Sequence, residues 1–214
     1  MAQEQLPIEA DLYAPYYYGK NNVLWVKSNI VVNTIDEYSY ETRCLSWMSI
    51  PTNSVPIDIR AEAQMFIDIV TDELQLKNMF FSGPDYYKHG SSIKLIDANP
   101  RLGQGLQIIN SMHDYSIIPK ILSGKPFSIE NHFLWKISRL KPGRIKSISD
   151  TSHLSEHLAR TNKKVKPGMI IPEFQHTQMD KFRQALYIKG INESDMLETY
   201  ETVNAQLQDC IEYY

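Results

Sequence analysis

The chain has 214 residues, 43% of them hydrophobic, and a formal net charge of −3 at pH 7. This length and apolar content suit one domain, or one domain with a small extension, and the near-balanced charge argues against a nucleic-acid partner. No apolar run reaches the roughly 20 residues of a membrane span, no signal-peptide pattern is evident, and two unclustered cysteines fit a reducing compartment, so we expect a cytoplasmic protein with no membrane partner.

The first half of the chain predicts strands followed by one long helix. Apolar residues predict strands over 8–18, 23–33 and 38–50, the first two joined by a Gly-containing turn. Residues 57–74 repeat apolar side chains at helical spacing. The inward face of this helix is expected to carry Ile59, Ala63, Phe66, Ile69 or Val70, and Leu74.

The most informative stretch is residues 93–105, which predicts a buried strand running into a polar loop with two glycines. Asp97, Asn99 and Arg101 occupy alternate positions, so they project to one side for as long as the chain stays extended. Asp and Asn offer hard oxygen ligands for Mg²⁺, and Arg offers a planar fork for phosphate or carboxylate. This combination suits the handling of a polyphosphate.

A second carboxylate, Asp85, lies twelve residues before Asp97, on the other side of a turn-forming cluster. In an antiparallel hairpin, a three-residue loop over 90–92 sets the two acids opposite each other with Cβ atoms roughly 5 Å apart, whereas a two-residue loop sets Asp85 opposite Ile96. Two carboxylates at such a short distance repel each other unless a divalent cation lies between them. We therefore predict a Mg²⁺ site on Asp85, Asp97 and Asn99; the alternative is two solvated acids and a helix-capping Asn99.

Short helices are predicted over 105–112 and 116–122, followed by a smaller closing subdomain over 127–214. In this subdomain two Pro-Gly turns each lead into a strand, and a final helix is expected to begin at Ser194. The elements together predict an α+β fold, an antiparallel sheet with packed helices. His153 and His157 have the spacing of a zinc pair, but no third ligand is evident, and a solvated helix surface is the simpler interpretation.

The segment from Asp85 to Gly105 resembles the closing motif of the ATP-grasp superfamily, in which an acid is followed about a dozen residues later by an E-x-N-P-R-like sequence. The core Asn-Pro-Arg is present here, and Asp97 stands where the family has Glu. The resemblance implies that Asp85, Asp97 and Asn99 hold the Mg²⁺ ions that bridge the ATP phosphates. It also implies that Arg101 is the catalytic residue that contacts the transferring or acyl phosphate.

Residues 2–11 are similar to the hinge of ATP-grasp domains, often E-x-x-L followed by another Glu. This similarity implies that Gln3, Glu4 and Leu6 bind adenine and that Glu9 binds the ribose hydroxyls. Gln3 stands where an acid is common, and the usual glycine before Glu9 is absent. An ordinary acidic strand is the alternative. If the hinge stands at this point, the chain is expected to lack the family's N-terminal domain and the lid lysines that hold the ATP phosphates.

The likeness implies ATP- and Mg²⁺-dependent joining of a small carboxylate to an amine, as in amino-acid ligases and carnosine-synthase-like members. We interpret residues 1–126 as the C-terminal half of an ATP-grasp domain and residues 127–214 as its closing subdomain with the final helix. Such a piece is expected to be incomplete as an enzyme, either cut from a longer chain or completed by a partner subunit. The competing hypotheses are a non-catalytic remnant that binds a nucleotide, a peptide or a partner, and an unrelated α+β domain with structural acids.

Overall fold

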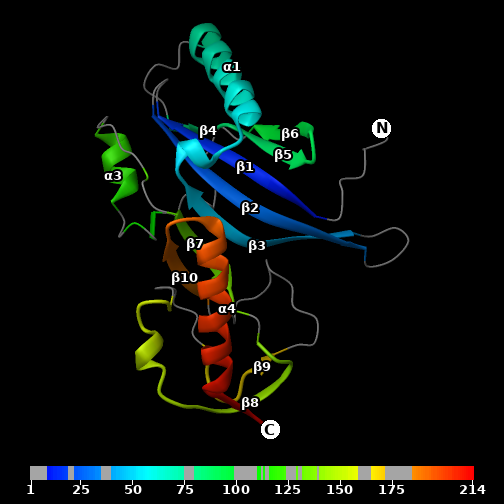
Figure 1. Ribbon diagram of the computed structural model, residues 1–214, viewed down its shortest axis with the longest axis vertical. Coiled ribbons are helices and arrows are strands. Elements are labelled where there is room, and N and C mark those ends of the chain that lie inside the picture. The colour runs from blue at the N-terminus through cyan, green and yellow to red at the C-terminus, as the bar shows by residue number, and fades with distance from the viewer. Residues whose placement is uncertain are drawn as a thin grey trace. The chain divides into compact units, whose positions relative to one another are not determined.

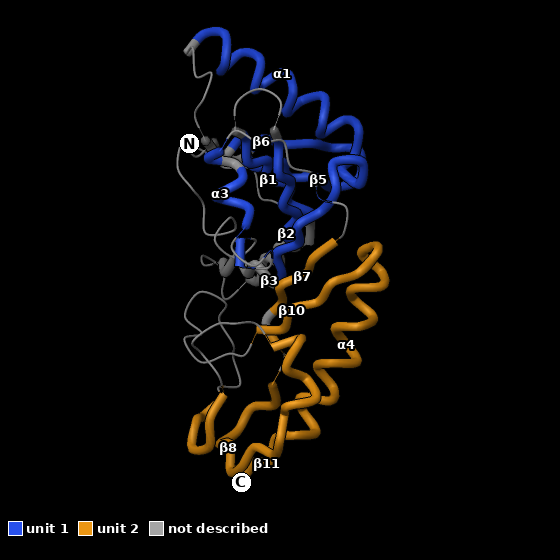
Figure 2. Tube along the Cα trace, turned by 90° about the vertical axis from the view of Figure 1, so that its left-hand side faces the viewer, with its two compact units in different colours: residues 1–131 blue, residues 132–214 orange. Residues whose placement is uncertain are grey.

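The computed structural model describes residues 9–18, 22–34, 40–74, 80–98, 110–111, 113, 116–123, 129, 132–138, 140–158, 165–171 and 185–214, at several element ends by their backbone alone. The chain divides into two compact units, Met1–Asn131 and His132–Tyr214 (Figure 2). In the described part of the chain, none of the helices has the length and apolar character that crossing a membrane requires.

The first unit is built on an antiparallel sheet (Figure 1). Its strands run in the order β3-β2-β1-β5-β6, and β4 also pairs with β1. The three strands and the long helix predicted for this region are confirmed, within two residues at each end. The described elements of this unit are β1 (Glu9–Tyr18), β2 (Asn22–Thr34), β3 (Tyr40–Ile50), η1 (Thr52–Ser54), α1 (Ile57–Leu74), β4 (Phe80–Ser82), β5 (Pro84–His89), β6 (Ser92–Ala98) and α3 (Ile117–Leu122).

Helix α1 covers one face of this sheet. The Tyr17 hydroxyl of β1 donates a hydrogen bond of 3.0 Å to the Ala63 carbonyl, and Lys88 of β5 forms an ion pair of 2.6 Å with Asp58 in the first turn of α1. The buried row of α1 is Ile59, Ala63, Ile67 and Thr71. The predicted inward row was right at Ile59 and Ala63 but named Phe66, which is half-buried, in place of the fully buried Ile67. Of the two alternatives Ile69 and Val70, Ile69 is 56% exposed and Val70 is half-buried. Phe66 and Ile67 are both apolar neighbours, so periodicity alone does not choose between them; the i, i+4 row follows the direction in which α1 crosses the strands.

The second unit pairs β7 with β10 and forms a separate three-stranded sheet in the order β11-β8-β9. Helix α4 packs on β10 and β7 and buries Met196, Tyr200, Val203 and Leu207. The helix begins after Asn192, whose side chain accepts a 2.9 Å hydrogen bond from the Asp195 amide, so the predicted cap at Ser194 was two residues late. The elements are β7 (His132–Ile137), β8 (Gly143–Ile148), η2 (Ser152–Leu154), β9 (Ile170–Ile171), β10 (Ala185–Gly190), α4 (Glu193–Asp209) and β11 (Ile211–Tyr213). The predicted α+β class, an antiparallel sheet with packed helices, is confirmed.

Candidate functional site

The β5–β6 hairpin holds the predicted acids, but its register differs from the simple hairpin expected from the sequence. His89 pairs with Ser92 and Tyr86 pairs with Leu95, so the loop has two residues, Gly90 and Ser91, and the predicted three-residue loop was wrong. Gly90 adopts φ +58°, as the first position of a primed two-residue turn requires. The tight turn is preferred because its twist matches that of the paired strands.

A β-bulge follows at Asp85. The pairing shifts between Tyr86 and Pro84, which faces Ala98, so one residue of β5, Asp85, lies opposite two of β6, Ile96 and Asp97. Bulges re-aim side chains and are frequent next to functional sites. The backbone register therefore leaves Asp85 across from both position 96 and position 97, the two partners that the sequence allowed.

Tyr87 and Lys94 lie on the sheet face opposite α1. Tyr86 and Lys88 belong to the α1 face, since Lys88 contacts Asp58, and side chains alternate along a regular strand. Tyr87, next but one to Asp85, is 2% exposed, and burial raises the pKa of its hydroxyl. Its cross-strand partner Lys94 brings a cation to the same face. This face thus carries a lysine and a buried phenol next to the bulge that contains the half-buried Asp85.

The remaining predicted site residues are described in part or not at all. Asp97 and Glu9 lie in β6 and β1, where only their backbone is described. The metal ligand Asn99, the catalytic residue Arg101 and the adenine-binding residues Gln3, Glu4 and Leu6 lie outside the described residues. Among the side chains that are described, no group of three or more His, Cys, Asp or Glu could hold a metal ion, and Asp97 and Asn99 are not in that set.

The histidine pair considered for zinc does not share a helix face. His153 lies in the short 3-10 helix η2, whereas His157 lies in the following turn, with Nδ1 3.3 Å from the Tyr187 carbonyl oxygen and Nε2 3.4 Å from Glu156. These contacts tie His157 to β10 and give it a structural role.

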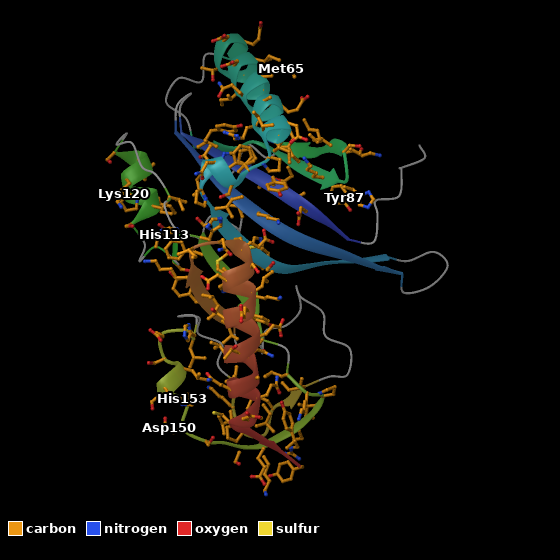
Figure 3. The ribbon with its side chains drawn as sticks, in the orientation of Figure 1. Met65, Tyr87, His113, Lys120, Asp150 and His153 are labelled. Carbon is orange, nitrogen blue, oxygen red and sulfur yellow. The ribbon has the colours of Figure 1, made fainter. Side chains whose placement is uncertain are left out.

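Sequence reasoning missed a contact between Ser49 of β3 and His113, a residue that Figure 3 labels. Ser49 is fully buried, and its Oγ lies 3.3 Å from Nε2 of His113. The two residues are 64 positions apart, and neither belongs to a motif. Only the alternation of β3, which sets Ser49 on the face away from Met48, could have hinted at it.

Comparison with solved structures shows that the fold of this chain is similar to that of a synthetase and of a ligase. The chain is similar to phosphoribosylglycinamide synthetase from Anaerococcus prevotii, with 14% identity and a TM-score of 0.58 over 99% of this chain and 54% of that one. It is similar to L-amino acid ligase from Bacillus licheniformis, with 10% identity and a TM-score of 0.61 over 97% of this chain and 55% of that one.

A third likeness is to the biotin carboxylase domain of a single-chain bacterial carboxylase, with 9% identity and a TM-score of 0.50 over 97% of this chain and 49% of that one. No family model matches the chain, and no curated protein sequence matches it. The chain therefore has the ATP-grasp fold predicted from its closing motif, and it spans about half the length of the solved structures it matches.

Proposed function

We propose that the first unit binds Mg²⁺ and ATP at the β5–β6 hairpin, with Asp85, Asp97 and Asn99 as metal ligands. The observation that supports this proposal is the bulged hairpin register, in which Asp85 lies across from the two positions 96 and 97. The ATP-grasp fold supports it independently, because the fold likeness extends over nearly the whole chain.

The donor set fits a small hard cation. Two carboxylates and one amide offer oxygen ligands, the kind that Mg²⁺ prefers. When bound, Mg²⁺ supplies neutralisation of the phosphate charge. Arg101 would hold a phosphate oxygen through its guanidinium fork, which positions the group to be transferred.

The adenosine end of the ligand is assigned to the N-terminal residues. In this proposal, Gln3, Glu4 and Leu6 contact adenine, and Glu9, at the start of β1, binds the ribose hydroxyls. Strand β1 also pairs with β5, so one strand joins the ribose position to the hairpin that carries Asp85. The nucleotide would thus be held along β1.

The reaction class we propose is ATP-dependent joining of a small carboxylate to an amine: the carboxylate takes the terminal phosphoryl group of ATP, and the amine then displaces phosphate from the acyl phosphate. Residues 1–126 would form the ATP-grasp half, and residues 127–214 would close it. Because the chain spans about half of the matched structures, we assign full turnover to an assembly that includes the other half, as a chain extension or a partner subunit.

Calorimetric titration of the chain with ATP in the presence and absence of Mg²⁺ tests this proposal. Asp85→Asn should weaken Mg²⁺-dependent ATP binding by about 100-fold, since even changes in the second sphere of a metal site cost 10–100-fold. Asp72→Asn is the matched control, because Asp72 is exposed on α1, outside the β5–β6 hairpin. ATP binding that needs no Mg²⁺, or that survives Asp85→Asn, would overturn the proposal. Binding without substrate-dependent ADP release would identify the non-catalytic module.

A further inference from the structure

Helix α1 carries a second apolar row, on the side that points away from the sheet. This outer row consists of Ile57, Ala61, Met65 and Ile69, at intervals of four residues. It is offset by two residues from the buried row of α1, and at about 100° per residue this offset sets the two rows on opposite sides of the helix. Ile57 is 77% exposed and Met65, labelled in Figure 3, is 55% exposed. Ala61 and Ile69 are exposed as well.

The outer row sets α1 apart from an ordinary surface helix. A helix that covers a sheet usually has polar residues opposite its buried row, because water solvates that side. Single exposed apolar residues are common, but a contiguous apolar patch is typical of an interaction site. From Ile57 to Ile69 the row is about 18 Å long, at about 1.5 Å per residue. A row at i, i+4 spacing suits a second helix, whose own side chains pack between those of the row.

Acidic side chains border the outer row. With five acids and one base, α1 has a net charge of −4, whereas the whole chain has −3, which leaves the rest of the chain at +1. The net negative charge of the protein therefore resides on this helix. Glu62 lies next to Ala61, Glu73 continues the row by one further interval, and both are exposed. The one base, Arg60, donates from Nε to the Val55 carbonyl at 3.1 Å.

This charge selects among the possible occupants of the outer row. A second copy of the chain would bring two helices of charge −4 together, and like charges across an interface disfavour association. An anionic lipid surface is disfavoured for the same reason. A helix whose apolar row is bordered by Lys or Arg matches both the outer row and its acidic border.

We propose that the outer row of α1 is a docking surface for a basic amphipathic helix of a partner protein. Apolar side chains of the partner would pack on Met65 and Ile69, and its cations would lie near Glu62 and Glu73. The surface lies on α1, outside the β5–β6 hairpin. The inference therefore does not depend on the proposed binding of Mg²⁺ and ATP.

Fluorescence polarisation with a designed peptide tests the inference on the full chain. The labelled probe has 18 residues, the length of α1, with Leu at every fourth position, Lys on both sides of this row and Ala or Gln elsewhere. A counterpart carries Glu in place of each Lys. The Lys probe should bind at least about tenfold more tightly than the Glu counterpart, and added salt should weaken its binding, because the charges at the border are solvent-exposed.

Substitutions in the outer row separate docking from a general attraction between charges. Met65→Gln and Ile69→Gln should each weaken binding of the Lys probe about tenfold, since each removes one apolar side chain from the contact. Gln is a good helix former and both positions are exposed, so the urea unfolding midpoint should stay at the wild-type value. Ile191→Gln is the matched control and should bind as wild type does, because Ile191 is 78% exposed but belongs to the second unit.

The acidic border has its own test. Glu62→Gln/Glu73→Gln should weaken binding of the Lys probe about threefold, the usual effect of exposed charge pairs. It should leave binding of the Glu counterpart equal or slightly stronger.

Several results would overturn the inference. They are no binding of the Lys probe, equal binding of the Lys and Glu peptides, and wild-type affinity in both Met65→Gln and Ile69→Gln. A wild-type dimer in sedimentation equilibrium that Met65→Gln converts to a monomer would identify a second copy as the occupant. Binding to phosphatidylserine vesicles that is lost in Met65→Gln would identify a membrane surface instead.

Discussion

Two tyrosines at the interface between α1 and the sheet give a sharp test of the fold. Tyr17 and Tyr86 are 3% and 2% exposed, and both belong to the face that α1 covers. The Tyr17 hydroxyl donates to the Ala63 carbonyl at 3.0 Å, whereas the buried Tyr86 hydroxyl has no hydrogen-bond partner in the described part of the structure. The same substitution, Tyr to Phe, therefore removes a hydrogen bond at Tyr17 and a buried hydroxyl without a partner at Tyr86.

The expected free energies differ in sign. Tyr17→Phe should lower the free energy of unfolding by about 1 kcal/mol, the net contribution of a buried hydrogen bond. Tyr86→Phe should leave it unchanged or raise it by up to about 1 kcal/mol, because burying an unpaired hydroxyl costs about 1–3 kcal/mol before any relaxation. The two rings keep their packing, so neither change opens a cavity.

Urea unfolding followed by tryptophan fluorescence measures this difference. Of the three tryptophans in the chain, Trp25 and Trp47 lie in the first unit, so a Trp135→Phe background restricts the signal to that unit. The slope of the free energy of unfolding against urea concentration should be the same in all variants, since unfolding exposes the same surface area in each. A loss in Tyr86→Phe as large as that in Tyr17→Phe would refute the hydrogen-bond assignment at this interface.

Two further outcomes follow from the geometry. Burial raises the pKa of the Tyr17, Tyr86 and Tyr87 hydroxyls, so the folded chain keeps protons that the unfolded chain releases near pH 10. The free energy of unfolding should therefore be constant below about pH 9 and fall as the pH rises above about 10. In a series of unfolding measurements across that range, Tyr86→Phe should make this fall less steep. Gly90→Ala should lower the free energy of unfolding by about 1 kcal/mol, because Gly90 has a φ of +58° and an added Cβ would meet no other atom. Gly190→Ala should lower it by about 1–3 kcal/mol, because the added Cβ would lie 2.6 Å from Cγ of Met196. Equal losses in thermal unfolding would contradict this distinction.

The sequence alone determined the local elements and the motif. Alternation predicted β1, β2 and β3, helical spacing predicted α1 from Ile57 to Leu74, and the Asn-Pro-Arg core predicted the ATP-grasp fold that the structural likeness confirms. These features depend on residues within a few positions of one another, and the repeat of the helix and of the strand can therefore be recognised in the sequence itself.

Tertiary structure decided which residues lie opposite each other across strands and which side chains become buried. The bulge at Asp85, the burial of Ile67 rather than Phe66 on α1, and the contact of His113 with Ser49 all depend on packing between distant segments. A spacing of twelve residues fits two hairpin registers equally well, and the two-residue turn and the bulge together leave Asp85 across from both candidate positions, 96 and 97. Local periodicity fixes which side chains can share a face, but the partner that covers the face fixes which of them become buried.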